Sequence, residues 1–186
     1  YKAAAKIDRS QGVAFMSYST LRSEAQVKDS TVEPKTRVDQ LVEWLGADFD
    51  GVIAFDEAHN MGNAIAMKGK RGMTKPSAQA LAGLELQRRL PKARVVYVSA
   101  TGATEVANLS YAERLGLWGA GTPFANIREF VANVASRGTA AMELVAQNLK
   151  SLGLYVARSI SWRGIQYRTL EHRLSTEQRE NYDTMA

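Results

Sequence analysis

Gly51-Val-Ile-Ala-Phe55 is followed directly by Asp56-Glu-Ala-His59, and this stretch decides the fold class of the chain. Short, nearly continuous apolar runs are typical of strands that are buried on both faces of a parallel sheet. Ligands of open α/β sheets bind beyond the carboxyl ends of the strands. The acids that follow Phe55 are therefore candidate functional residues.

Two other runs have the same character as residues 51–55, namely residues 12–18 and 93–98. Helical periodicity separates the three runs, with apolar residues spaced three and four apart in residues 38–45 and 80–90. This alternation predicts an α/β fold with a parallel sheet flanked by helices. Between these elements, residues 67–77 are rich in Gly and Lys and are predicted to form an exposed loop.

The pattern changes after residue 101, where glycines mark a loop-rich region that reaches residue 124. Beyond it we predict two helices, two β-like stretches and the start of a final helix. They cover residues 125–135, 139–152, 154–158, 165–172 and 175–178. In the last of these, Gln178 occupies the Glu/Gln position of a capping box that begins at Ser175.

The overall composition excludes several classes of protein. The 186 residues carry 24 Lys and Arg against 19 Asp and Glu, which gives a formal net charge of +5. A polyanionic partner is compatible with this charge, although a solvated surface is the simpler interpretation. The chain has no Cys, which excludes disulfides, zinc–thiolate sites and Cys nucleophiles. Its apolar runs are far shorter than the roughly 18 residues that cross a bilayer, so we expect no membrane partner.

Asp56 and Glu57 are suited to nucleotide chemistry at the end of a strand. One carboxylate can hold Mg²⁺ on the phosphates of a nucleotide, and the next can orient or deprotonate the attacking water. Ser99-Ala-Thr101 follows residues 93–98 in the same way, and its hydroxyls can bond a neighbouring loop. The alternative interpretation of each motif is a simple turn, but the two together form a compound pattern that chance rarely produces.

Asp56-Glu-Ala-His59 resembles motif II of superfamily 2 helicases and translocases, which is the Walker B motif in its DEAH form. Ser99-Ala-Thr101 resembles motif III of the same proteins. The surrounding sequence is similar to the strawberry notch family, which includes helicase-like regions of large bacterial, plasmid or phage proteins described as methylase/helicase. The similar stretches are residues 55–63, 90–103, 114–119 and 153–158. The final residues 174–182 resemble the end of the first motor lobe of Swi/Snf-type remodellers.

The resemblance implies a role for each motif residue, with ATP and Mg²⁺ as cofactors. Asp56 would hold the metal, Glu57 would activate the hydrolytic water, and His59 would contact the nucleotide site and link motif II to motif III. Ser99 and Thr101 would couple the state of the nucleotide to nucleic-acid contact.

Two groups of residues are candidate nucleic-acid contacts. Ser19, Thr20 and Arg22 follow the first predicted strand and resemble the block that precedes motif II in these motors, although a plain turn explains them equally well. The second group is basic and lies in the predicted loop, where a solvated loop is the simpler interpretation. It comprises Lys68, Lys70, Arg71 and Lys75.

The chain departs from the family pattern because it contains no G-x-x-x-x-G-K-[ST] sequence, the Walker A loop that cradles phosphates. We therefore expect residues 1–186 to be the later part of a first RecA-like lobe, inactive alone. Residues 102–174 would be a family-specific helical and β extension, and residues 175–186 the start of a linker. The upstream Walker A segment and a second RecA-like lobe would be its missing partners.

The sequence thus favours a fragment of an ATP-dependent nucleic-acid helicase or translocase, with DNA preferred over RNA as the substrate. The alternative is a non-catalytic nucleic-acid-binding or scaffold module that retains the helicase fold. We expect a cytoplasmic location with a prokaryotic or phage origin, or a nuclear location if the source is eukaryotic.

Overall fold

The computed structural model describes residues 5–24, 34–69, 72–100, 106–157, 166 and 168–185. The chain forms two compact units, Tyr1–Tyr155 and Val156–Ala186. Within the described ranges, no helix is long and apolar enough to cross a membrane.

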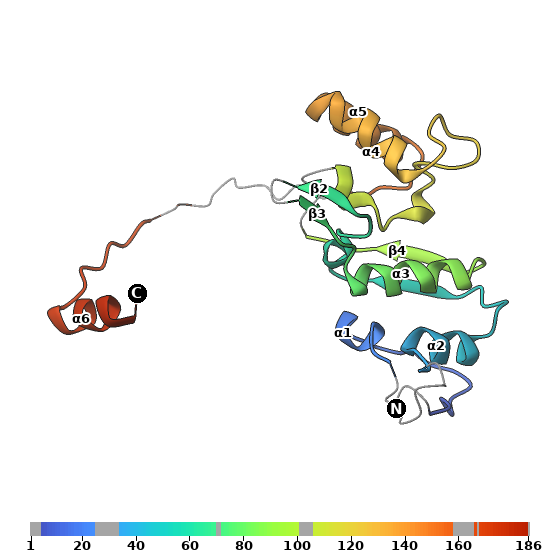
Figure 1. Cartoon of the computed structure of the whole chain (residues 1–186), viewed down its shortest axis with the longest axis horizontal. Coiled ribbons are helices and arrows are strands. Elements are labelled where there is room, and N and C mark those ends of the chain that lie inside the picture. Colours follow the sequence, from blue (N-terminus) through green and yellow to red (C-terminus); the bar gives the residue numbers. More distant parts are fainter. Residues whose placement is uncertain are drawn as a thin grey trace. The chain divides into compact units, whose positions relative to one another are not determined.

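The centre of the first unit is a parallel pair of strands, β1 (Val52–Phe55) and β4 (Arg94–Tyr97). The register pairs Val52 with Arg94 and Phe55 with Tyr97, so the two strands end at the same edge. Helix α3 (Ala78–Arg89) lies between them in the chain and runs beside β4 in space (Figure 1). The predicted strands at 51–55 and 93–98 and their parallel direction are confirmed. Their expected burial on both faces is wrong, because Val52 is 60% and Val96 is 46% exposed.

Three helices pack together against this pair of strands. They are the short α1 (Tyr18–Leu21), α2 (Arg37–Leu45) and α3, which contact one another. The core that they share buries side chains such as Val38, Phe55 and Leu84. Helices α2 and α3 coincide closely with the periodic segments 38–45 and 80–90, because their apolar faces are the ones that become buried.

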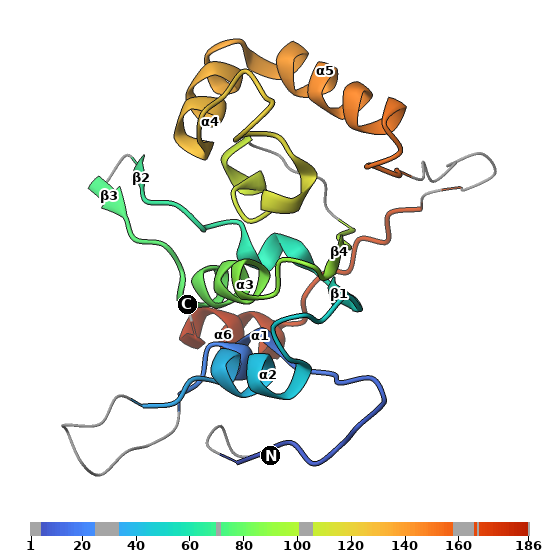
Figure 2. The same ribbon diagram turned by 90° about the vertical axis from the view of Figure 1, so that its right-hand side faces the viewer.

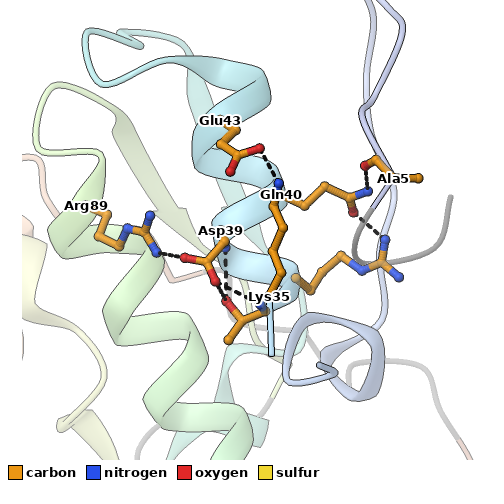
Figure 3. A network of polar contacts seen from close by, with 8 residues as sticks. Ala5, Lys35, Asp39, Gln40, Glu43 and Arg89 are labelled. Atoms are coloured by element: carbon orange, nitrogen blue, oxygen red, sulfur yellow. Dashed lines mark hydrogen bonds and ion pairs between the residues drawn. The ribbon is translucent and has the colours of Figure 1, made fainter. Parts of the chain in front are cut away.

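Asp39 ties the start of α2 to the end of α3 (Figure 3). Its backbone N–H donates to Thr36 Oγ1 at 3.0 Å, while its carboxylate accepts from the Thr36 N–H at 2.8 Å, which completes a capping box. Arg89 donates to the same carboxylate at 2.5 Å. This hydrogen bond is the main reason why the pKa of Asp39 falls to about 2, and the bonds from Thr36 lower it further.

Two close contacts fix α3 within the core. A Cβ atom built on Gly83 would lie 2.4 Å from Sδ of the fully buried Met61, so glycine allows α3 to approach the segment after β1. At the other end, the Arg114 guanidinium donates to the carbonyls of Gln87, Leu90 and Pro91 at 3.0, 2.9 and 2.8 Å. Arg114 thereby binds carbonyls in and just beyond the last turn of α3, where a helix leaves its final carbonyl groups without intrahelical partners.

A second, smaller core follows residue 105. It joins the 3₁₀ turn η2 (Val106–Leu109) to α4 (Ile127–Ser136) and α5 (Gly138–Ser151), and Trp118 and Phe124 pack on the ring of Phe130. Both helices agree with the segments predicted at 125–135 and 139–152. The chain leaves α5 through Gly153 at φ +71°, and the Leu154 N–H bonds the Leu149 carbonyl.

In the second unit, the described residues contain one helix, α6 (Thr176–Met185). The Ser175 N–H donates to the Gln178 side chain at 3.0 Å, and the Gln178 N–H donates to Ser175 Oγ at 3.3 Å. The predicted capping box is therefore confirmed.

The predicted strand at residues 12–18 is wrong. Residues 13–17 lie outside regular structure, and residues 18–21 form α1. Val13 is 80% and Phe15 93% exposed. A strand needs a neighbour for its backbone hydrogen bonds, and the sheet containing β1 consists of β1 and β4 among the described residues.

The predicted loop at residues 67–77 is also wrong, because it contains the antiparallel strands β2 (Met67–Gly69) and β3 (Gly72–Thr74). This hairpin lies between β1 and α3 in the chain, and Figure 2 shows it extending away from both of them. The two predicted β-like stretches do not form strands in residues 154–157 or 168–172. The first of these segments is instead hydrogen-bonded to the end of α5. Residues 158–165 and 167 lie outside the described residues.

Candidate functional site

Asp56 and Glu57 form a turn at the carboxyl end of β1, and we refer to these two residues as the acid turn. The turn leads into the 3₁₀ segment η1 (Ala58–Met61), of which Ala58 and Met61 are fully buried. The Val98 N–H donates to the Phe55 carbonyl at 2.9 Å, and the Ala58 N–H donates to the Val98 carbonyl at 2.8 Å. These bonds extend the β1–β4 ladder, so the carboxylates are exposed while the backbone behind them is held.

Glu57 has an unusual backbone conformation. Its φ of 47° and ψ of 48° lie in the left-handed region, which no other non-glycine residue adopts in the part of the chain that the structure describes. A side chain in this region costs of order 1 kcal/mol or more, and such residues concentrate at functional sites. The Glu57 N–H donates to Asp56 Oδ1 at 3.0 Å, which supports the turn locally.

His59 connects the two strand ends through its side chain. Its Nδ1 atom lies 3.0 Å from Ser99 Oγ, directly beyond β4, and 3.3 Å from Glu57 Oε2. All three side chains are exposed to solvent. The structure therefore brings Asp56, Glu57, His59 and Ser99 to one edge of the sheet, whereas Thr101 lies outside the described residues.

Tyr18 also reaches this edge, and sequence reasoning missed it. Its hydroxyl donates to the Asp56 carbonyl oxygen at 2.8 Å across 38 positions of sequence. Burial raises the pKa of Tyr18 to about 12, and Tyr111, Asp56 and Glu57 act in the same direction, so the hydroxyl remains a donor at neutral pH. The one available signal was a tyrosine, with an apolar ring and a polar end, beside the predicted hydroxyl group of residues 19 and 20.

The candidate nucleic-acid residues near α1 lie on a short, well-capped helix. The Thr20 N–H donates to Ser17 Oγ at 3.2 Å, and this oxygen is 2.9 Å from both Ser19 Oγ and Thr20 Oγ1. Ser19 and Arg22 are exposed, and Thr20 is half-buried. Because Tyr18 belongs to the same helix, α1 is joined directly to the acid turn.

Two of the four basic candidates lie in or directly beside the β2–β3 hairpin rather than in a loop. Lys68 lies in β2, and Lys75 is exposed directly after β3. Lys70 and Arg71 lie outside the described residues. The hairpin thus places Lys68 and Lys75 outside the buried core of the first unit.

The acid turn alone does not form a metal cage. Among the residues whose positions are described, no group of three or more His, Asp and Glu side chains could hold a metal ion. One or two carboxylates are what Mg²⁺ uses when phosphates and water supply its remaining ligands. The exposed Asp56 carboxylate fits that kind of site.

A parallel pair of strands with flanking helices and an acid turn at the strand ends defines a partial RecA-like α/β fold of the P-loop NTPase class. The chain belongs to the family described as P-loop containing NTP hydrolase pore-1, whose model matches residues 1–184.

Its relatives include strawberry notch proteins, which confirms the resemblance predicted from the motifs. The chain is 47% identical to "Protein strawberry notch homolog 1" of Gallus gallus over 93% of its own length. It is 46% identical to "Protein strawberry notch" of Drosophila melanogaster over 93%, and 38% identical to "Protein FORGETTER 1" of Arabidopsis thaliana over 95%. It spans only 13%, 10% and 13% of these three proteins. No solved structure shows a significant match.

These relatives bear on the expected origin of the chain. They come from animals and a plant, and they give no support to the prokaryotic or phage origin that the sequence analysis favoured.

Proposed function

We propose that this chain is part of the ATP-hydrolysing lobe of a longer protein that translocates along or remodels nucleic acid, with DNA as the favoured substrate. The observation that carries the proposal is the contact between His59 and Ser99, which joins the ends of two parallel strands beside the exposed acid turn. This is the edge at which ligands of α/β sheets bind.

The acid turn supplies the chemistry in this proposal. Asp56 holds Mg²⁺ together with phosphate oxygens and water, and Glu57 orients or deprotonates the attacking water. The metal, when bound, neutralises charge on the phosphates. The left-handed backbone of Glu57 supports this role, because a strained conformation persists only where the surrounding structure enforces it.

Communication with nucleic acid is assigned to His59, Ser99 and Thr101. A hydrogen bond between His59 and Ser99 makes the position of the segment after β4 depend on the segment after β1. A change at the nucleotide would therefore move residues 99–101, where the family resemblance places the coupling to nucleic-acid contact.

Nucleic-acid contact itself is proposed at two places. Ser19, Thr20 and Arg22 offer hydroxyl and guanidinium donors to phosphates beside the acid turn. The β2–β3 hairpin offers Lys68, Lys70, Arg71 and Lys75, whose contribution to binding would fall as salt rises.

The proposal requires segments that this chain does not contain. The sequence has no Walker A loop, so a phosphate-cradling loop must come from elsewhere in the protein, as must a second RecA-like lobe. Within the chain, residues 102–174 are proposed as the family-specific extension and residues 175–186 as the start of the linker. If the source is eukaryotic, as the relatives from animals and a plant suggest, we propose a nuclear location for a DNA-directed activity.

The competing proposal is a non-catalytic scaffold or nucleic-acid-binding module that retains the fold. Two exposed acids on a strained turn favour hydrolysis over this competing proposal.

The test is Mg²⁺-dependent ATP hydrolysis by the complete protein, compared with Glu57→Gln. We expect turnover to fall at least 100-fold, of the order that general-base catalysis contributes, with ATP binding retained. Lost ATP binding would make Glu57 structural, and a complete protein without turnover would favour the scaffold.

A further inference from the structure

The acid turn is held from two directions. From β4, the Val98 carbonyl accepts the Ala58 N–H at 2.8 Å, just after the turn. From α1, the Tyr18 hydroxyl donates to the Asp56 carbonyl at 2.8 Å, within the turn. The peptide between Asp56 and Glu57 therefore has a tertiary hydrogen bond whose donor is a side chain, and removal of one oxygen atom abolishes it.

This restraint acts on the most strained residue of the site. The Asp56 carbonyl belongs to the peptide unit that precedes Glu57, so its direction is linked to the φ of 47° at Glu57. Without the bond from Tyr18, that peptide is freer to rotate toward an ordinary conformation. The Glu57 carboxylate and the Asp56 carboxylate would then both lose their fixed positions.

Helix α1 is itself anchored in the core while its polar side chains remain accessible. Leu21 is buried, and α1 contacts both α2 and α3. Ser17 Oγ lies 2.9 Å from the hydroxyls of Ser19 and Thr20 on the same helix. The backbone that carries Tyr18 is therefore held in place both by the core and by its own cap.

We propose that Tyr18 is a positioning residue that holds the acid turn in its active geometry. The inference rests on the proposed ATP hydrolysis for its functional consequence. The restraint on the backbone does not depend on that activity.

The test is Tyr18→Phe in the complete protein, a substitution that keeps the half-buried ring and removes only the hydroxyl. Amide hydrogen exchange at Glu57 and Ala58 should become about fivefold faster, the effect of losing one hydrogen bond of ordinary strength. The turnover number for ATP hydrolysis should fall by a similar factor while KM for ATP stays within twofold.

Tyr97→Phe is the matched control. The Tyr97 hydroxyl donates to the buried Gln87 side chain, so its loss should lower the melting temperature. Exchange at residues 56–62 should stay at the parent rate in this variant, because the acid turn keeps its bond from Tyr18.

The outcomes separate the inference from the proposed function. Unchanged exchange at residues 56–62 in Tyr18→Phe overturns the inference, whatever the ATPase result. Faster exchange combined with no hydrolysis by the parent protein overturns the proposed function and leaves Tyr18 as a restraint on the turn. Faster exchange with parental turnover shows that the restraint has no part in catalysis and also overturns the inference.

Discussion

His59 Nδ1 lies 3.0 Å from Ser99 Oγ, although 40 positions separate the two residues in the chain. Each follows the end of a strand, and the parallel register of β1 and β4 brings those ends together. The same His59 nitrogen is 3.3 Å from Glu57 Oε2, so the Ser99 hydroxyl and the Glu57 carboxylate compete for one ring atom. The orientation of His59 is therefore set jointly by the two motifs.

Ser99→Ala should uncouple the motifs without unfolding the protein. Both side chains are exposed, so the melting temperature should change little, whereas stimulation of ATP hydrolysis by DNA should fall about fivefold through loss of one hydrogen bond. Steady-state assays with and without DNA measure this ratio. Ser136→Ala, at an exposed serine on α4, is the control, and equal stimulation in both variants contradicts the coupling role.

Glu57→Gly should stabilise the protein while abolishing turnover. Glycine adopts the left-handed region without a steric penalty, so we expect a gain of about 1 kcal/mol in the free energy of unfolding. Chemical denaturation measures the gain. Asp56→Gly, whose backbone is not left-handed, should show no such gain, and a destabilised Glu57→Gly would mean that the carboxylate contributes more than the strain costs.

Neutralising the basic group should weaken DNA binding in a salt-dependent way. In this variant Gln replaces Lys68, Lys70, Arg71 and Lys75. The slope of log binding constant against log salt concentration should then decrease in magnitude by up to about 0.9 for each phosphate that is no longer neutralised. Fluorescence anisotropy across a salt series gives the slope. The same replacement at exposed Lys92 and Arg128 is the control, and an unchanged slope at the hairpin assigns it to solvent.

Asp39→Asn should destabilise the protein by about 1 kcal/mol at neutral pH, because it removes a charge-assisted bond to Arg89 and weakens the cap of α2. The pKa of Asp39 falls from 3.8 to about 2 on folding, so its contribution is complete above pH 4 and is lost as the pH falls through 2. Unfolding curves of both proteins should therefore converge between pH 4 and pH 2. A difference that stays constant over this range contradicts the assignment.

Gly83→Ala should destabilise the protein by about 1–3 kcal/mol, the usual cost of overpacking. The added methyl group meets the Met61 sulfur in the buried core. In a Met61→Ala background the space is free, and the same change should be neutral or stabilising because alanine favours a helix. Chemical denaturation of the four proteins of this double-mutant cycle gives the interaction free energy between the residue at position 83 and Met61. If Gly83→Ala destabilises both backgrounds equally, the contact with Met61 is not the cause.

Most of the elements that the sequence predicted well have a buried face. Strands β1 and β4 and helices α2 and α3 all contribute to one core, so the period of their apolar residues reports their structure. Residues 12–18 have an equally apolar sequence but no paired neighbour among the described residues, and apolar composition alone does not form a strand. The β2–β3 hairpin is the opposite case, because its strands pair through their backbones although their sequence has no apolar pattern that would predict strands.

The candidate site was predictable only where a motif marks it. Asp56, Glu57, His59 and Ser99 could be placed at one sheet edge because parallel strands end together. Tyr18 and Arg114 were missed, since both donate to backbone carbonyls and a carbonyl acceptor leaves no mark in the sequence. The left-handed conformation of Glu57 was missed for a related reason, as glutamate has no preference for it.

The contacts of Arg114 have a practical consequence for dissecting this protein. A truncation after residue 100 would expose the end of α3 at Gln87, Leu90 and Pro91, which Arg114 now covers. It would also remove buried Tyr111, whose carbonyl accepts a hydrogen bond from Gln87. Shortened versions that stop at residue 100 should therefore aggregate, and cuts intended to keep this core intact belong beyond Tyr155.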